Sequence, residues 1–212
     1  MIKRSVVFRE HAKDVQSACI THPFVMGIAD GTLDPSVFSR WVIQDWKYLL
    51  TYMKVLDQVA DLAPTSEATD RWRELARFTR DEELSLHRGF AARFGISKED
   101  MDRAMYGPVT ASYTKYLEET SKISYGHGLA SVIPCGVGYV SIAKTLSTGP
   151  LPDDSRYADW IRTYADPTFA EAVAWMEMEL DIVEGDDSEL AELYLRGAQY
   201  EYSFWNQLWT GW

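Results

Sequence analysis

Apolar residues recur at intervals of three and four along most of the chain, which is the spacing of an amphipathic helix. The clearest run lies between residues 35 and 60, where this spacing continues over more than twenty residues. Asp34 fits an N-cap before it, and Pro35 fits the first helical position. The same spacing predicts helices at 8–20, 66–94, 97–105, 110–121, 125–147, 154–165, 167–184 and 187–209.

Two further signals mark helix boundaries within this pattern. Gly95 fits the end of one helix, and Ser97 with Asp100 fits the N-cap of the next. Asp166 followed by Pro167 signals another start. No segment alternates with the period of two that a half-buried strand requires. We therefore predict an all-α fold, with residues 1–212 forming a single helical bundle domain.

The composition adds many aromatic residues and a negative charge. Eight tryptophans and twelve tyrosines in 212 residues suit either a core of large side chains or an enclosed ligand cavity. Asp and Glu number 32 against 21 Lys and Arg, a formal charge of -11. Because no basic cluster interrupts this excess, we expect no nucleic-acid partner.

The sequence also bears on location. The basic start, Met1 to Ser5, is not followed by the apolar core of a signal peptide, and no run reaches about 18 apolar residues. The two cysteines, Cys19 and Cys135, show neither the spacing of a zinc site nor a disulfide framework. We expect a cytoplasmic protein without a membrane partner.

Cys135 lies in an unusual stretch, Ser131 to Val140, within a predicted helix. Pro134 has no N–H group and should kink the helix, while Gly136 and Gly138 leave room for a ligand or another helix. If the helix restarted there, freed N–H groups would favour the thiolate and so a nucleophilic role. The alternative is a small buried cysteine at a tight helix crossing, and Cys19 is expected in the core.

Two carboxylates fall beside apolar helical faces. Asp45 lies on the same side of its helix as Trp41 and Tyr48, and burying it would require a partner. It could instead be a partly exposed acid at the edge of the apolar stripe. Glu201 shares a face with Phe204 and Trp205, which could form a ring-stacking wall beside an acid or base. These aromatics would equally dock a C-terminal helix.

Glu83 and His87 are four residues apart on one predicted helical face. Such a pair is half of the motif of a di-iron carboxylate bundle. The chain has four histidines, however, and none lies beyond residue 127, where later helices would have to contribute. A hydrogen-bonded pair is therefore favoured, and no metal site is predicted.

Seven short motifs, in order, resemble the TenA family, also called the thiaminase II or aminopyrimidine aminohydrolase family, whose fold is shared with haem oxygenase and the PqqC proteins. The resemblance covers residues 8 to 209. The motifs are His22 to Leu33, Ile43 to Leu49, Glu82 to His87, Tyr113 to Leu117, Pro134 to Tyr139, Trp160 to Tyr164 and Glu201 to Trp205.

The resemblance implies a hydrolase that converts 4-amino-5-aminomethyl-2-methylpyrimidine, a breakdown product of thiamin, to 4-amino-5-hydroxymethyl-2-methylpyrimidine for thiamin salvage. Hydrolysis of thiamin itself is a side capacity of the family. The family pattern makes Cys135 the nucleophile that adds to a ring carbon, Glu201 the acid and base, and Asp45 the ligand of the amidine edge. It also assigns substrate-binding positions, which are Tyr48, Tyr113, Tyr139, Tyr164 and, stacking on the ring, Phe204.

The resemblance implies no metal or organic cofactor and a homotetrameric assembly. One departure concerns the two positions after the cysteine, where the family commonly has an aromatic and this chain has Gly136 and Val137. The pocket is therefore expected to be roomier on that side. Two other functions stay open: a regulatory or ligand-binding protein without hydrolase activity, and a PqqC-like or oxygenase-like enzyme, against which the few histidines argue.

Overall fold

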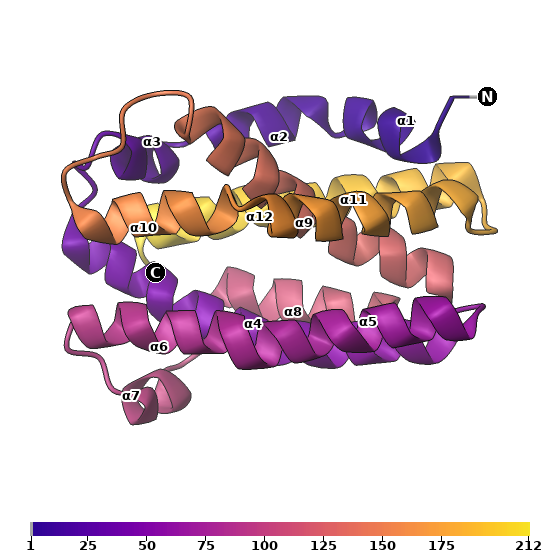
Figure 1. Ribbon diagram of the computed structural model, residues 1–212, viewed down its shortest axis with the longest axis horizontal. Helices are drawn as coiled ribbons and strands as arrows, with labels where there is room; N and C mark the ends of the chain where they lie inside the picture. The colour runs from indigo at the N-terminus through magenta and orange to yellow at the C-terminus, as the bar shows by residue number, and fades with distance from the viewer. Residues whose placement is uncertain (1) are drawn as a thin grey trace.

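The computed structural model (Figure 1) describes residues 2–212, and this part of the chain contains helices and no β-strand. The predicted all-α fold is thereby confirmed. In chain order the elements are α1 (Arg4–His11), α2 (Lys13–Ile20), α3 (Pro23–Ala29), α4 (Pro35–Leu62), α5 (Ser66–Phe78), the π-helix η1 (Thr79–Glu83), α6 (Leu84–Arg93), α7 (Lys98–Arg103), α8 (Pro108–Thr120), α9 (Tyr125–Leu146), α10 (Ser155–Tyr164), α11 (Pro167–Ile182) and α12 (Asp187–Thr210).

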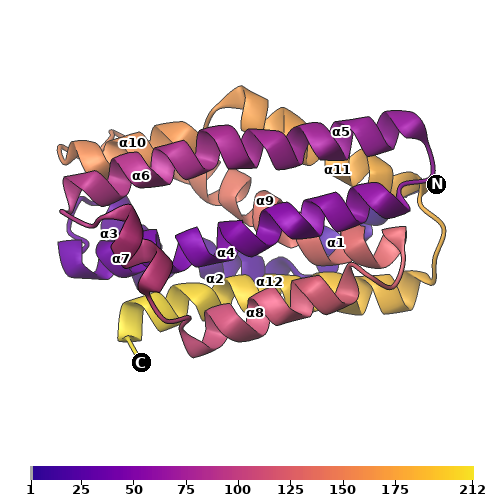
Figure 2. The same cartoon turned by 90° about the horizontal axis from the view of Figure 1, so that it is seen from below.

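Most of the long helices lie along the long axis of the molecule, and α9 passes through the middle of the bundle in both views (Figures 1 and 2). Helix α9 packs against α11 and α12, while α4 packs against α5 and α8. The core is rich in aromatic residues, and five tryptophans are almost completely buried, namely Trp41, Trp46, Trp72, Trp160 and Trp205. The aromatic content therefore serves a large core as well as the cavity described below.

The predicted helix boundaries are confirmed where a cap signals them. The Asp34 carboxylate accepts a hydrogen bond from the Ser36 N–H at 2.7 Å. Ser97 and Asp100 form a reciprocal capping box. Gly95 has a φ of 68°, the left-handed conformation of a glycine that ends a helix. At Asp34 and Ser97 a side chain at a fixed offset satisfies helix-end groups, and at Gly95 the missing side chain permits the left-handed turn, which makes each boundary readable from sequence.

Two parts of the helical prediction were wrong in detail. The segment 66–94 is not one regular helix, because the π-helical turn η1 separates α5 from α6. The segment 8–20 is broken at Ala12, and its first helix starts earlier, at Arg4. The short helix α3 was not predicted, although His22 caps it by accepting from the Phe24 N–H at 3.2 Å. Seven residues are too few for a periodic pattern to emerge.

Helix α9 continues from Tyr125 to Leu146 with Pro134 inside it, so the helix does not restart before Cys135. Small residues make the crossings here tight. A Cβ on Gly136 would lie 2.7 Å from the Val173 side chain of α11, and one on Gly197 of α12 would lie 2.9 Å from the Pro134 ring. The predicted tight helix crossing is therefore present, and it fixes Cys135 between two neighbouring helices.

By length and composition, α9 is apolar enough to cross a membrane. The sequence did not indicate this, because no unbroken run of about 18 apolar residues occurs in it. In its most apolar window, 61% of the residues are buried inside the protein. Its central position in the bundle accounts for this apolarity (Figure 2). Helix α9 is therefore the core helix of the bundle.

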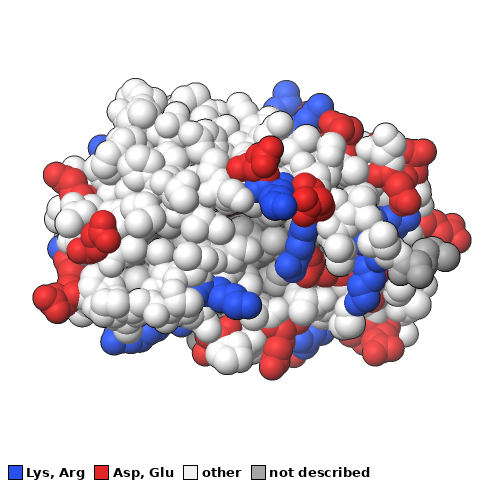
Figure 3. Space-filling model, turned by 90° about the horizontal axis from the view of Figure 1, so that it is seen from above, with Lys and Arg blue, Asp and Glu red and all other residues white. Residues whose placement is uncertain are grey.

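The charged side chains are unevenly distributed over the surface. Figure 3 shows one face, on which red and blue side chains are interspersed toward one end and a broad uncharged region lies toward the end that carries α3. The sequence from Val15 to Ala29 contains no Lys, Arg, Asp or Glu, and the nearby stretch from Thr145 to Pro152 contains none either. This uncharged face is thus made largely by α2, α3 and the segment after α9.

Candidate active site

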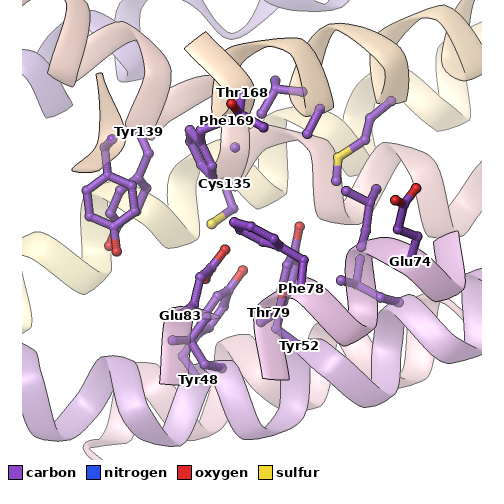
Figure 4. Close-up of a pocket in the computed structure, with 18 of the residues that line it drawn as sticks. Tyr48, Tyr52, Glu74, Phe78, Thr79, Glu83, Cys135, Tyr139, Thr168 and Phe169 are labelled. Carbon is purple, nitrogen blue, oxygen red and sulfur yellow. The ribbon is translucent and has the colours of Figure 1, made fainter. Parts of the chain in front are cut away.

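A cavity opens between α4, α5, η1, α9, α10 and α11 (Figure 4). It encloses about 980 Å³ of space free of protein atoms, its open mouth included. Five of the eight predicted site residues line it, namely Asp45, Tyr48, Cys135, Tyr139 and Tyr164. Other lining residues, not predicted from the sequence, include Tyr52, Phe78, Thr79, Glu83, Phe169 and Met176.

The Cys135 side chain points into this cavity, with its sulfur facing the ends of Glu83 and Tyr48 (Figure 4). Burial raises the pKa of the thiol well above its usual range, and the nearby negative charge of Glu201 raises it further. The Tyr48 hydroxyl acts in the opposite direction and lowers this pKa. These surroundings therefore favour the neutral thiol, contrary to the expectation that freed N–H groups would favour a thiolate.

Asp45 is a buried carboxylate with several partners. One of its oxygens lies 2.7 Å from Nε2 of His87, a close polar contact whose geometry is not that of a hydrogen bond. The other oxygen accepts from the Tyr139 hydroxyl at 3.4 Å, and that hydroxyl accepts from the Trp41 indole at 3.2 Å. Asp45 is only 4% exposed. The expectation that it needs a partner is confirmed, and the alternative of an exposed edge position is wrong.

His87 is completely buried and lies between two oxygen acceptors. Its Nε2 faces Asp45, and its Nδ1 lies 3.1 Å from the main-chain carbonyl oxygen of Glu83. The predicted bond between residues 83 and 87 is therefore made by the Glu83 backbone, not by its carboxylate. The His87 ring is therefore held between the Glu83 carbonyl and the buried Asp45 carboxylate.

Replacement of His87 by phenylalanine, which is similar in size, should lower the free energy of unfolding by about 3–5 kcal/mol, because it leaves the buried Asp45 charge without its partner. Adding Asp45→Asn should restore a large part of this loss, since the unpaired charge is then gone. Urea unfolding of the two single variants and the double variant measures both effects. A double variant no more stable than His87→Phe would contradict the pairing.

Glu201 lies behind the cavity wall. One carboxylate oxygen accepts a hydrogen bond of 2.7 Å from the Tyr113 hydroxyl, and Glu201 is 4% exposed. Burial raises its pKa to about 7, while Tyr113 and Cys135 act to lower it. A carboxyl group that titrates near neutral pH can both accept and donate a proton there. Glu201 thus has the properties of an acid and base next to the thiol.

The remaining predicted residues form two aromatic groups. Tyr139 and Tyr164 contact each other on the cavity wall, with ring centroids 4.6 Å apart. Tyr113 and Phe204 are buried behind Tyr48, at centroid distances of 5.1 Å and 6.4 Å from it. In this structure Phe204 therefore supports a lining tyrosine and does not itself face the cavity. The buried Tyr48 hydroxyl lies next to the Cys135 thiol, whose pKa it lowers.

Glu83 is the lining residue whose importance the sequence did not reveal. It ends η1, and its side chain points from there toward Cys135 (Figure 4). Burial raises its pKa to about 7, with a further contribution from Asp45. A regular helix through residues 66–94 gives no indication that this carboxylate faces the cavity, because a π-helical turn shifts the face that a residue occupies.

The comparisons with known proteins agree with this geometry. Residues 9–211 match the model of the TENA/THI-4/PQQC family. An aminopyrimidine aminohydrolase from Helicobacter pylori is 31% identical over 207 residues, covering 93% of this chain and 94% of the relative.

Two solved structures share the fold. A TenA homologue from P. horikoshii OT3 superposes with a TM-score of 0.92 at 22% identity and covers all of both chains. A domain of unknown function with a haem-oxygenase-like fold, from Shewanella denitrificans OS217, has a TM-score of 0.74 at 15% identity over 99% of this chain and 93% of its own. The predicted bundle type is confirmed, and the chain belongs to the TENA/THI-4/PQQC family.

Proposed function

We propose that this protein is an aminopyrimidine hydrolase that replaces the amine of 4-amino-5-aminomethyl-2-methylpyrimidine by a hydroxyl group. The observation that carries the proposal is the convergence of Cys135, Asp45 and Glu201 around one tyrosine-lined cavity. The full-length similarity to a relative named aminopyrimidine aminohydrolase supports the same activity. The product would serve thiamin salvage, and thiamin is the expected second substrate.

The arrangement suggests how a flat, weakly electrophilic ring could be bound and activated. Asp45 would accept from the exocyclic amine and hold a proton on the adjacent ring nitrogen, which makes the ring a better electron acceptor. His87 would keep this carboxylate in place. Tyr139 and Tyr164 present aromatic faces and hydroxyls on the cavity wall. A planar heterocycle fits such a surface.

The chemical step would begin as the Cys135 sulfur bonds to a ring carbon. The thiol proton passes to Glu201, and a ring electron pair moves onto the nitrogen whose proton Asp45 holds. That pair then expels the protonated substituent: the methylene C–N bond breaks and an exocyclic C=C bond forms. The ammonia that is released takes the proton from Glu201 and departs as ammonium. Water adds to this methylene carbon and gives its proton to Glu201. The ring expels the sulfur, which regains the proton.

The proposed activity can be tested with the purified protein. Incubation with 4-amino-5-aminomethyl-2-methylpyrimidine should release ammonia and 4-amino-5-hydroxymethyl-2-methylpyrimidine in equal amounts, and thiamin should release the same pyrimidine. Separation of the products by liquid chromatography measures both reactions. If folded protein turned over neither compound, it would not be a hydrolase of this kind.

We also propose that the protein assembles as a homotetramer. The uncharged face made by α2, α3 and the segment after α9 offers an area that can be buried between copies (Figure 3). Large apolar side chains are also exposed on the surface and could be buried between copies, among them Val6, Val7, Met26, Trp209 and Trp212. Sedimentation equilibrium should give a mass near four times 24.2 kDa, and a monomeric mass would rule this assembly out.

A further inference from the structure

The charged side chains that line the cavity are not equally satisfied by the protein. Asp45 lies against His87, and Glu74, at the far end of the cavity from Tyr139, pairs with Arg71 (Figure 4). Glu201, behind the wall, accepts from Tyr113. The carboxylate of Glu83, in contrast, forms no hydrogen bond or ion pair with any side chain or main-chain group that the structure describes. One negative group inside the cavity is thus left without a partner.

A carboxylate in a largely enclosed cavity is costly unless something pairs with it. The protein holds the main chain at Glu83 in place, because His87 contacts its main-chain carbonyl with one nitrogen and Asp45 with the other. One imidazole ring therefore links the main chain at Glu83 to the carboxylate of Asp45. The π-helical turn that ends at Glu83 directs its side chain toward Cys135 (Figure 4). Such turns occur frequently at functional sites.

The missing partner should be a positively charged group that approaches the thiol. Asp45 is already paired with His87, so the positive charge of a ligand would find its strongest uncompensated attraction at Glu83. A primary alkyl amine, like that of lysine, is protonated near neutral pH. The aminomethyl substituent of the proposed substrate is such an amine, and its carbon is next to the ring that Cys135 would attack.

Resting on the proposed function, we propose that Glu83 binds the protonated substituent of the pyrimidine and makes the site selective for cationic leaving groups. The neutral hydroxymethyl product lacks the charge and is held less tightly, which favours its release. The positively charged thiazolium of thiamin meets the same requirement. Glu83 is thereby a specificity-determining residue, distinct from the nucleophile and from the acid and base.

The experiment compares two ligands that differ in this one group. Calorimetry at pH 8 measures the binding of the aminomethyl and the hydroxymethyl pyrimidine to Cys135→Ser, in which turnover is prevented, and to Cys135→Ser with Glu83→Gln. The added substitution should weaken binding of the aminomethyl compound about ten- to a hundredfold, the usual effect of losing a charged hydrogen bond. The affinity for the hydroxymethyl compound should change by less than about threefold.

A matched control is Asp81→Asn on the same π-helical turn, where the side chain is exposed to solvent. It removes the same charge from η1 and should change neither affinity, while thermal melting shows that all variants are folded. An equal loss for both ligands, or no loss for either, would overturn the role of Glu83. If wild-type protein hydrolyses the substrate, such a result leaves the proposed function intact. If neither pyrimidine binds to Cys135→Ser, both proposals fail.

Discussion

Replacement of Cys135 by serine is expected to reduce turnover of the aminomethylpyrimidine by at least about a thousandfold, because a hydroxyl group is a much weaker nucleophile at neutral pH than a sulfur atom. The substitution replaces one sulfur atom by oxygen and changes the side-chain volume only slightly. Because Cys135 is not the binding partner of the amidine edge or of the ammonium group in our proposal, substrate affinity should change only slightly. Steady-state rates together with calorimetric affinities separate the two effects.

The other cysteine provides the control. Cys19 lies in α2, is 3% exposed and packs in the core, as expected from the sequence. Cys19→Ala should lower stability by the small amount expected for a core truncation and retain most of the turnover. If Cys135→Ser kept more than a tenth of the wild-type rate, the covalent step would be wrong, and water activated by Glu201 would have to attack the substrate directly.

The neutral state of the thiol is compatible with this prediction. A cavity that holds several carboxylates disfavours a free thiolate, and burial acts in the same direction. The sulfur would therefore lose its proton as it adds to the ring, to a neighbouring group with a suitable pKa. Glu201, with a pKa raised to about 7, meets that condition. The cost of a permanent buried thiolate is avoided, and the charge develops only when substrate is present.

The sequence predicted those features that depend on local spacing. The caps at Asp34 and Ser97 act over two or three residues, and the long apolar stripe of α4 placed Asp45 on a buried face. The pairing of Asp45 with His87 was not predicted, since it joins two helices far apart in the chain. Helical spacing related His87 to Glu83, four residues away, but could not show that its other nitrogen reaches α4.

The assignment of functional roles depended on more than spacing. Residue patterns alone left Cys135 between a nucleophile and a packing residue, and family resemblance favoured the first. The structure shows that Cys135 combines a tight helix crossing with a side chain directed into the cavity. Glu83 was not recognised as a site residue, because its orientation depends on a single π-helical turn that periodicity does not reveal.

Glu201→Gln is expected to affect activity and stability in opposite directions. Turnover should fall by about a hundredfold or more, because glutamine can neither accept the thiol proton nor return one to the leaving nitrogen. The free energy of unfolding at pH 8, in contrast, should rise by up to about 3 kcal/mol, since the pKa of Glu201 is raised from 4.5 to about 7 and one pKa unit corresponds to about 1.4 kcal/mol.

The sign of the stability effect follows from the two protonation states. Below pH 4.5 the carboxyl is protonated in both the folded and the unfolded chain, so the substitution should gain little. Between pH 4.5 and about 7 the unfolded chain releases the proton while the folded protein keeps it, and stability is progressively lost as the pH rises. Above about pH 7 the folded protein carries the buried charge as well, and the gain from Glu201→Gln should be constant.

Urea unfolding at pH 5 and pH 8 measures this difference, and Glu119→Gln is the matched control. Glu119 has a side chain that is 66% exposed and lies 3.8 Å from Lys115, so its neutralisation should give no gain that grows with pH. If the stability difference between Glu201→Gln and the wild type were the same at pH 5 and pH 8, Glu201 would not be held at a raised pKa. A variant with wild-type turnover would remove Glu201 from the mechanism. An inactive variant that is more stable than the wild type at pH 8 would indicate that the buried charge is kept for catalysis at the expense of stability.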